Sequence, residues 1–172
     1  IQETGGHPLF KMYDTPIQFN VGIMHAGEWP AMVPANCVME GGMGFLPNKR
    51  IDEIKQDLKQ VIQENGNEWL KNHITIEYPK LHNDAFETDV THPFVREFYN
   101  VMKKYGLPSE PSGWIVSCDA RLFNRVGGMP TMVFGAGTLE DAHSASESIK
   151  IEDMKIATRV LADFIVSWCG SK

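Results

Sequence analysis

A histidine among acidic residues is the part of this sequence best suited to chemistry. His143 follows Glu140 and Asp141 and precedes Glu147, and a Gly-Ala-Gly turn lies a few residues before it. Neutral imidazole is the commonest protein ligand for zinc, and an apolar strand that ends in a glycine turn can hold such a ligand on a loop. His143 is therefore a candidate metal ligand, with an ordinary surface histidine as the alternative.

An aspartate and an arginine follow a short apolar run at residues 114–117. The carboxyl end of a strand is where α/β sheets bind ligands. Arg121 either clamps a substrate carboxylate through two hydrogen bonds or pairs with a nearby acid. Asp119 is interpreted as a cap of the next helix. Cys118 is interpreted as an inert thiol, because no helix N-terminus precedes it to activate a nucleophile; a cysteine hydrolase is a third alternative.

The elements that must position these residues follow from the spacing of apolar side chains. Alternating or continuous apolar runs predict strands over residues 18–26, 33–45, 74–78, 114–117 and 130–134. The first two are expected to pair as an antiparallel hairpin. Helical spacing predicts helices over residues 51–65, 92–106 and 151–168, with a helix or turn over 119–126. Asn48 is the predicted N-cap of the first helix.

Two regions result, divided at the polar stretch of residues 83–91. Strand, strand, helix and strand make a small α+β layer in the first region. Helix, strand, helix, strand and helix make part of a parallel α/β sheet in the second. Since a sheet normally has more than two strands, the second region is expected to be incomplete.

Composition excludes several classes of partner. The formal net charge is −6 and the 16 basic residues are scattered, which argues against binding of nucleic acid. No apolar run approaches the roughly 20 residues that span a membrane. Three cysteines without paired spacing, and first residues that lack a signal-peptide pattern, predict a cytoplasmic protein.

The order of these elements and three local motifs resemble the zinc amidohydrolases that include acetylornithine deacetylase, succinyl-diaminopimelate desuccinylase and glutamate carboxypeptidases. Residues 23–35 are similar to the hairpin of that family's lid domain, and residues 118–121 to its substrate-contacting Ser-Asp-Gly-Arg segment. Residues 130–137 with His143 and Glu147 resemble the strand, the glycine turn and the "His, three residues, Glu" motif that carries its last metal ligand.

The resemblance implies an α/β protein in which a small α+β lid, which also dimerises, occupies residues 1–83. The C-terminal part of a mixed or parallel α/β zinc-hydrolase domain would occupy residues 84–172. His143 would bind one of two zinc ions, with cobalt as an alternative metal. Arg121, Ser117 and Gly137 would contact the substrate. The implied reaction is hydrolysis of an N-acyl amino acid or peptide amide bond by zinc-activated water.

The family's other metal ligands and its general base precede the lid, so they are expected upstream of Ile1. The chain is then part of a longer metallopeptidase or deacetylase of amino-acid metabolism. It would be inactive alone, completed by an N-terminal catalytic segment and paired as a homodimer. The family's lid often carries Asn near Ala31 and Arg near Gly42, and this sequence has neither. A non-catalytic dimerisation or binding module that retains the fold is the alternative.

Overall fold

The computed structural model describes residues 6–80, 83–139 and 142–170. The chain divides into two compact units. The first contains Ile1–Ala85 with Gly113–Ser117, and the second contains Phe86–Ser112 with Cys118–Lys172. Helices combine with a small antiparallel sheet, which confirms the predicted fold class as an α+β mixture.

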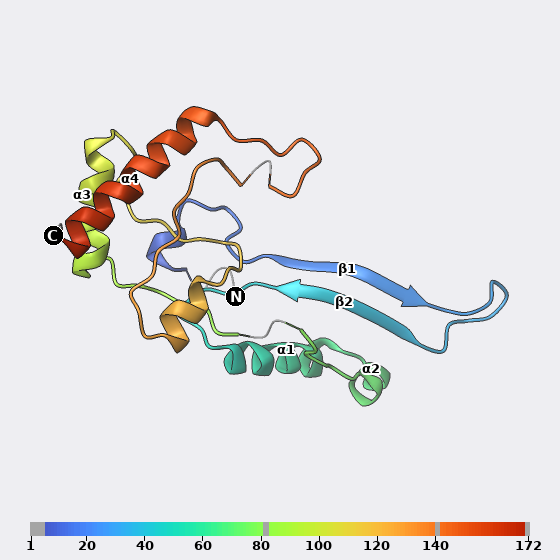
Figure 1. The fold of residues 1–172 in the computed structure, drawn as a ribbon. Coiled ribbons are helices and arrows are strands. Elements are labelled where there is room, and N and C mark those ends of the chain that lie inside the picture. The colour runs from blue at the N-terminus through green and yellow to red at the C-terminus, as the bar shows by residue number, and fades with distance from the viewer. Residues whose placement is uncertain (1–5, 81–82, 140–141, 171–172) are drawn as a thin grey trace. The chain divides into compact units, whose positions relative to one another are not determined.

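The sheet of the first unit is a two-stranded hairpin, as the alternating apolar residues predicted (Figure 1). Strand β1 (Phe19–Ala26) pairs antiparallel with β2 (Cys37–Met43), and a bulge interrupts the register between Val21 and Ile23. Gly41 is required where the strands approach, because a Cβ atom there would collide with the carbonyl oxygen of Asn20. Nearly every residue of the two strands is exposed.

Helix α1 (Ile51–Asn65) follows the hairpin, and its N-terminus is capped differently from the prediction. The Ile51 amide donates to Asp84 Oδ1 at 2.7 Å, and the Arg50 amide donates to Glu53 Oε2 at 2.7 Å. The prediction of an Asn48 cap was wrong, because a carboxylate 33 positions away in the chain satisfies a free amide of the first turn. Helix α2 (Glu68–His73), which was not predicted, is capped by Asn67.

Three predicted strands are not strands in the described part of the chain. Residues 74–78, 114–117 and 130–134 have no regular secondary structure, and none joins a ladder. A strand exists only where a neighbour supplies hydrogen bonds along its length, and apolar composition does not supply that neighbour. The Ile74 amide instead closes α2 by donating to the Leu70 carbonyl at 3.0 Å.

Each unit has its own core. In the first, Phe10, Ile17 and Leu46 are buried, and the Tyr13 hydroxyl donates to the Gly113 carbonyl at 3.0 Å. That hydrogen bond helps to hold residues 113–117 in this unit.

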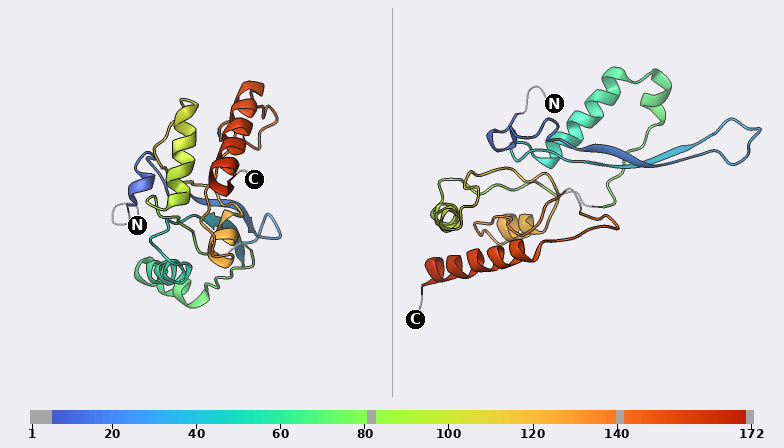
Figure 2. Two further views of the ribbon diagram at one scale, coloured as in Figure 1. Left: turned by 60° about the vertical axis from the view of Figure 1, so that its left-hand side comes forward. Right: turned by 90° about the horizontal axis from the view of Figure 1, so that it is seen from above.

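In the second unit, helices α3 (Pro93–Lys104) and α4 (Ile151–Cys169) pack together (Figure 2). Their core contains Phe98, Val101, Val160 and Phe164. Both helices lie where their periodicity predicted. The predicted helix or turn over residues 119–126 contains a short π-helical turn, Leu122–Val126.

Candidate functional site

The segment before the glycine turn is held by side chains rather than by a sheet. Met132 and Phe134 pack against the α3–α4 core, and the Phe134 and Phe98 rings meet edge to face with centroids 5.0 Å apart. The Thr88 hydroxyl bonds the backbone of Thr131. A segment anchored in this way can support a turn and a ligand loop without being a strand.

The turn and the loop have unusual backbone conformations. Gly137 has a φ of 88°, which a glycine adopts without strain. His143 has a φ of 62° and is the one non-glycine residue with positive φ in the described ranges. Its amide donates to Glu147 Oε2 at 3.0 Å, and its side chain is exposed. Such left-handed residues cost energy and cluster at functional sites, which singles out His143 independently of its residue type.

The arginine of the candidate site folds back over its own loop. Arg121 Nη1 donates to the Cys118 carbonyl at 2.6 Å, and Nη2 lies 3.8 Å from Asp119 Oδ1. The Arg121 side chain is only 13% exposed. The structure therefore contains the ion pair between Arg121 and a nearby acid, which was one of the two alternatives for Arg121 from the sequence. Asp119 faces Arg121, and the π-helical turn that follows has no side-chain cap.

Ser117 and Gly137, the other predicted substrate contacts, are both exposed. Ser117 ends the segment that belongs to the first unit, whereas Arg121, Gly137 and His143 belong to the second. The structure brings His143 to Glu147 and Arg121 to Asp119. Substrate contact by Ser117, Arg121 and Gly137 remains a prediction.

A complete metal centre does not form within residues 6–80, 83–139 and 142–170. No three His, Cys, Asp or Glu side chains gather there in a metal-binding arrangement. His143 offers one exposed imidazole, whereas a catalytic zinc needs about three protein ligands. Glu140 and Asp141 lie outside the described residues. These residues fit one ligand of a metal site, and no catalytic step through a metal is derived from them.

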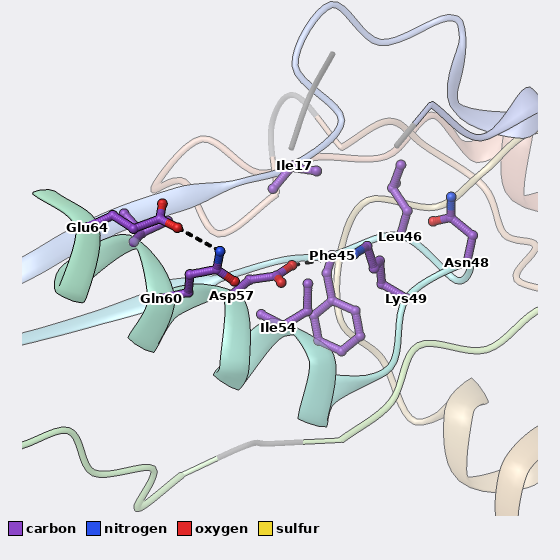
Figure 3. Close-up of a pocket in the computed structure, with 10 residues that line it drawn as sticks. Ile17, Phe45, Leu46, Asn48, Lys49, Ile54, Asp57, Gln60 and Glu64 are labelled. Atoms are coloured by element: carbon purple, nitrogen blue, oxygen red, sulfur yellow. Dashed lines mark hydrogen bonds and ion pairs between the residues drawn. The ribbon is translucent and has the colours of Figure 1, made fainter. Parts of the chain in front are cut away.

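A groove of about 350 Å³ lies in the first unit, between α1 and the base of the hairpin (Figure 3). Ile17, Leu46 and Ile54 contribute apolar lining. At its rim, Lys49 Nζ lies 3.4 Å from Asp57 Oδ2. None of the predicted site residues lines this groove. The charges of Lys49 and Asp57 at its rim neutralise each other.

Comparison with known proteins decides the family. The sequence profile of peptidase family M20/M25/M40 matches residues 9–167. The chain belongs to that family. The family is generally metal-dependent, and membership confirms the resemblance seen in the sequence.

Individual M20/M25/M40 relatives are distant. N-formyl-4-amino-5-aminomethyl-2-methylpyrimidine deformylase of Bacillus subtilis (strain 168) is 25% identical over 179 residues, covering 96% of this chain and 41% of that protein. The protein of the same name from Halalkalibacterium halodurans is 25% identical over 174 residues, covering 87% of this chain and 38% of that protein.

Acetylornithine deacetylase of Vibrio cholerae serotype O1 is 24% identical over 165 residues, covering 95% of this chain and 40% of that protein. The chain therefore spans about two-fifths of the length of these relatives.

Two features of this member of the family were not found from the sequence. Thr88 lies in the polar stretch that was interpreted as a boundary, and Asn124 lies in the π-helical turn. Both bond the segment that leads to the glycine turn. The sequence carried no signal for either.

In the described part of the chain, no helix has the length and apolar character needed to cross a membrane.

Proposed function

We propose that this chain is the lid and the C-terminal catalytic portion of a zinc-dependent deacylase or peptidase. The enzyme would cleave the amide bond of an N-acyl amino acid or a peptide, as acetylornithine deacetylase and succinyl-diaminopimelate desuccinylase do. The observation that carries the proposal is the conformation of His143. It lies within the matched region, after a glycine turn, with a left-handed backbone whose amide is bonded by Glu147.

The residues of this chain would divide the work. His143 would supply one metal ligand, and Glu147 would fix its loop by accepting the His143 amide. A bound zinc would polarise the scissile carbonyl and activate water. Arg121 would hold a substrate carboxylate after its side chain turns away from Asp119. Ser117 and Gly137 would contact the substrate. The general base would come from elsewhere in the complete enzyme.

The exposed apolar side chains of α4 support the proposal that another protein segment packs against the second unit. Helix α4 buries Val160 and Phe164, but its other side exposes several large apolar side chains: Ile151, Met154, Leu161, Ile165 and Val166. Exposed apolar surface of this extent marks an interaction surface. Since the relatives are more than twice as long, the proposed occupant is the N-terminal catalytic segment.

The hairpin supports the proposed homodimer. Phe19, Met24 and Met39 are each more than half exposed on it, and a two-stranded sheet has two unpaired edges. Unpaired strand edges readily add another strand, and two copies of one edge can pair across a two-fold axis. A lid that dimerises through these strands would cover apolar surface that water now contacts.

The names of the relatives narrow the substrate class. Both deformylase and acetylornithine deacetylase denote removal of an acyl group, and both proteins are distant from this chain. A small N-acylated amine or amino acid is accordingly the proposed substrate.

The three free cysteines are consistent with a cytoplasmic enzyme.

The test uses the full-length natural protein. We expect it to bind zinc and to hydrolyse members of an N-formyl and N-acetyl amino-acid panel. Replacing the proposed ligand (His143→Ala) should lower kcat at least 100-fold, whereas His25→Ala on β1 should change it less than threefold. A dimeric protein without zinc or hydrolysis would contradict the enzyme and favour the binding module. The isolated residues 1–172 are expected to be inactive.

A further inference from the structure

A compact hydrogen-bonded cluster joins the residues before α3 to the segment before the glycine turn. The Thr88 hydroxyl donates to the Thr131 carbonyl at 2.7 Å and accepts the Thr131 amide at 3.0 Å. Asn124 Nδ2 donates to the same hydroxyl at 3.2 Å and to the Met129 carbonyl at 3.2 Å. We name these four residues the threonine clip.

The threonine clip uses its hydrogen-bonding capacity fully. A hydroxyl has one proton and two lone pairs, and Thr88 donates once and accepts twice. The side-chain amide of Asn124 spends both protons on two acceptors. Because Thr88 bonds both the amide and the carbonyl of Thr131, it makes the two bonds that a paired residue of a neighbouring strand would make.

The clip determines how the chain approaches the candidate site. Thr131 is held by Thr88, and the next two inward side chains, Met132 and Phe134, pack in the α3–α4 core. Gly135 to Gly137 follow at once, and the chain then reaches His143. The backbone between Met129 and Phe134 is thus fixed by polar bonds at one end and by packing at the other, immediately before the glycine turn.

We infer that Thr88 and Asn124 are positioning residues for the glycine turn and His143. Removing the Thr88 hydroxyl leaves the Thr131 amide and carbonyl without that partner. Residues 129–134 are then held less firmly, so the positions of the glycine turn and of His143 vary more. Groups that hydrogen-bond a metal ligand directly change metal affinity about 10- to 100-fold when mutated, and because Thr88 acts on His143 only through the intervening backbone we expect the low end of that range. The inference rests on the proposed function, since it treats His143 as a metal ligand.

The test compares four variants of the full-length natural protein, one of them Asn124→Ala. Thr88→Val keeps the shape of the side chain and removes the hydroxyl, whereas Thr88→Ser keeps the hydroxyl. Thr91→Val is the matched control, because Thr91 bonds only the nearby Asp89 in the exposed turn before α3. Zinc affinity is measured by competition with a chelator, and backbone NMR order parameters are measured at residues 131–137.

We expect Thr88→Val to weaken zinc binding about tenfold and to lower the backbone order parameters at residues 131–137. Thr88→Ser should stay within threefold of the natural protein, and Thr91→Val should match it. Asn124→Ala removes the bonds to the Thr88 hydroxyl and to the Met129 carbonyl but leaves both Thr88–Thr131 bonds, so it should give a smaller effect in the same direction. A Thr88→Val variant with reduced thermal stability but unchanged zinc affinity and unchanged order parameters at residues 135–137 would overturn the inference.

Failure of the proposed function is recognised separately. If the natural protein binds no zinc, the proposed function is wrong whatever the variants do. The order parameters then decide the positioning role alone. Lower values through Gly137 in Thr88→Val, restored in Thr88→Ser, would support it, and a change confined to Thr131 would refute it.

Discussion

The Phe98→Ala substitution tests whether the aromatic core of the second unit supports the candidate site. Phe98 is 5% exposed, and its ring meets Phe164 and Phe134 edge to face with centroids 4.9 and 5.0 Å apart. Truncating a buried phenylalanine costs about 3–5 kcal/mol, to which each aromatic pair contributes about 0.5–1.5 kcal/mol. We expect a loss of about 4 kcal/mol, or nearly 1,000-fold in the folding equilibrium constant.

Urea denaturation of the purified protein measures this loss, with Phe123→Ala as the matched control. Phe123 is the same residue type in the same unit but is 56% exposed, so its loss should cost less than about 1 kcal/mol. Because Phe134 packs on Phe98, the backbone order parameters of Gly135 and Gly137 should also fall in Phe98→Ala. Similar costs for the two variants, or a cost below 1 kcal/mol for Phe98→Ala, would refute the packing argument.

Three further perturbations follow from single contacts. Asp84→Ala removes the acceptor of the Ile51 amide and should destabilise α1 by about 1 kcal/mol in denaturant titrations; an unchanged midpoint would disprove the cap. His143→Gly should be about 1 kcal/mol more stable than His143→Ala, because glycine tolerates a φ of 62°; equal stabilities would mean no backbone strain. Ser167 donates to Glu97 and is the main cause of the lowered pKa of that carboxyl, so Ser167→Ala should raise the pKa in an NMR titration. A carboxylate whose pKa is lowered in the folded state stabilises the protein at pH values above its ordinary pKa of about 4.3, and that stabilisation is lost as the pH falls through the folded-state pKa. Ser167→Ala should therefore make the free energy of unfolding depend less steeply on pH on the acid side, and an unchanged Glu97 titration would contradict this.

Local periodicity accounts for the elements that the sequence predicted correctly. The β1–β2 hairpin, α3 and α4 each show a two- or 3.6-residue pattern over their own length. The strand predictions at residues 114–117 and 130–134 failed because a strand depends on a neighbour, which apolar composition does not specify. The cap of α1 failed for a similar reason, since Asp84 lies 33 residues from the amide that it accepts.

The candidate site shows the same division. His143 and the glycine turn were found because residue type and local spacing mark them. The local ion pair of Arg121 was left open because the sequence favours neither a substrate carboxylate nor Asp119 as its partner. Thr88 and Thr131 are 43 residues apart, and an ordinary polar stretch gives no sign that its threonine holds another segment in register.

The central claim is that His143 is a metal ligand of an M20/M25/M40 amidohydrolase, and anomalous diffraction at the zinc edge tests it most directly. Crystals of the full-length natural protein grown with zinc should show an anomalous peak about 2.0–2.1 Å from one imidazole nitrogen of His143. A fully occupied zinc site that excludes His143, or a zinc-loaded active enzyme whose His143 imidazole contacts only solvent, would contradict the account.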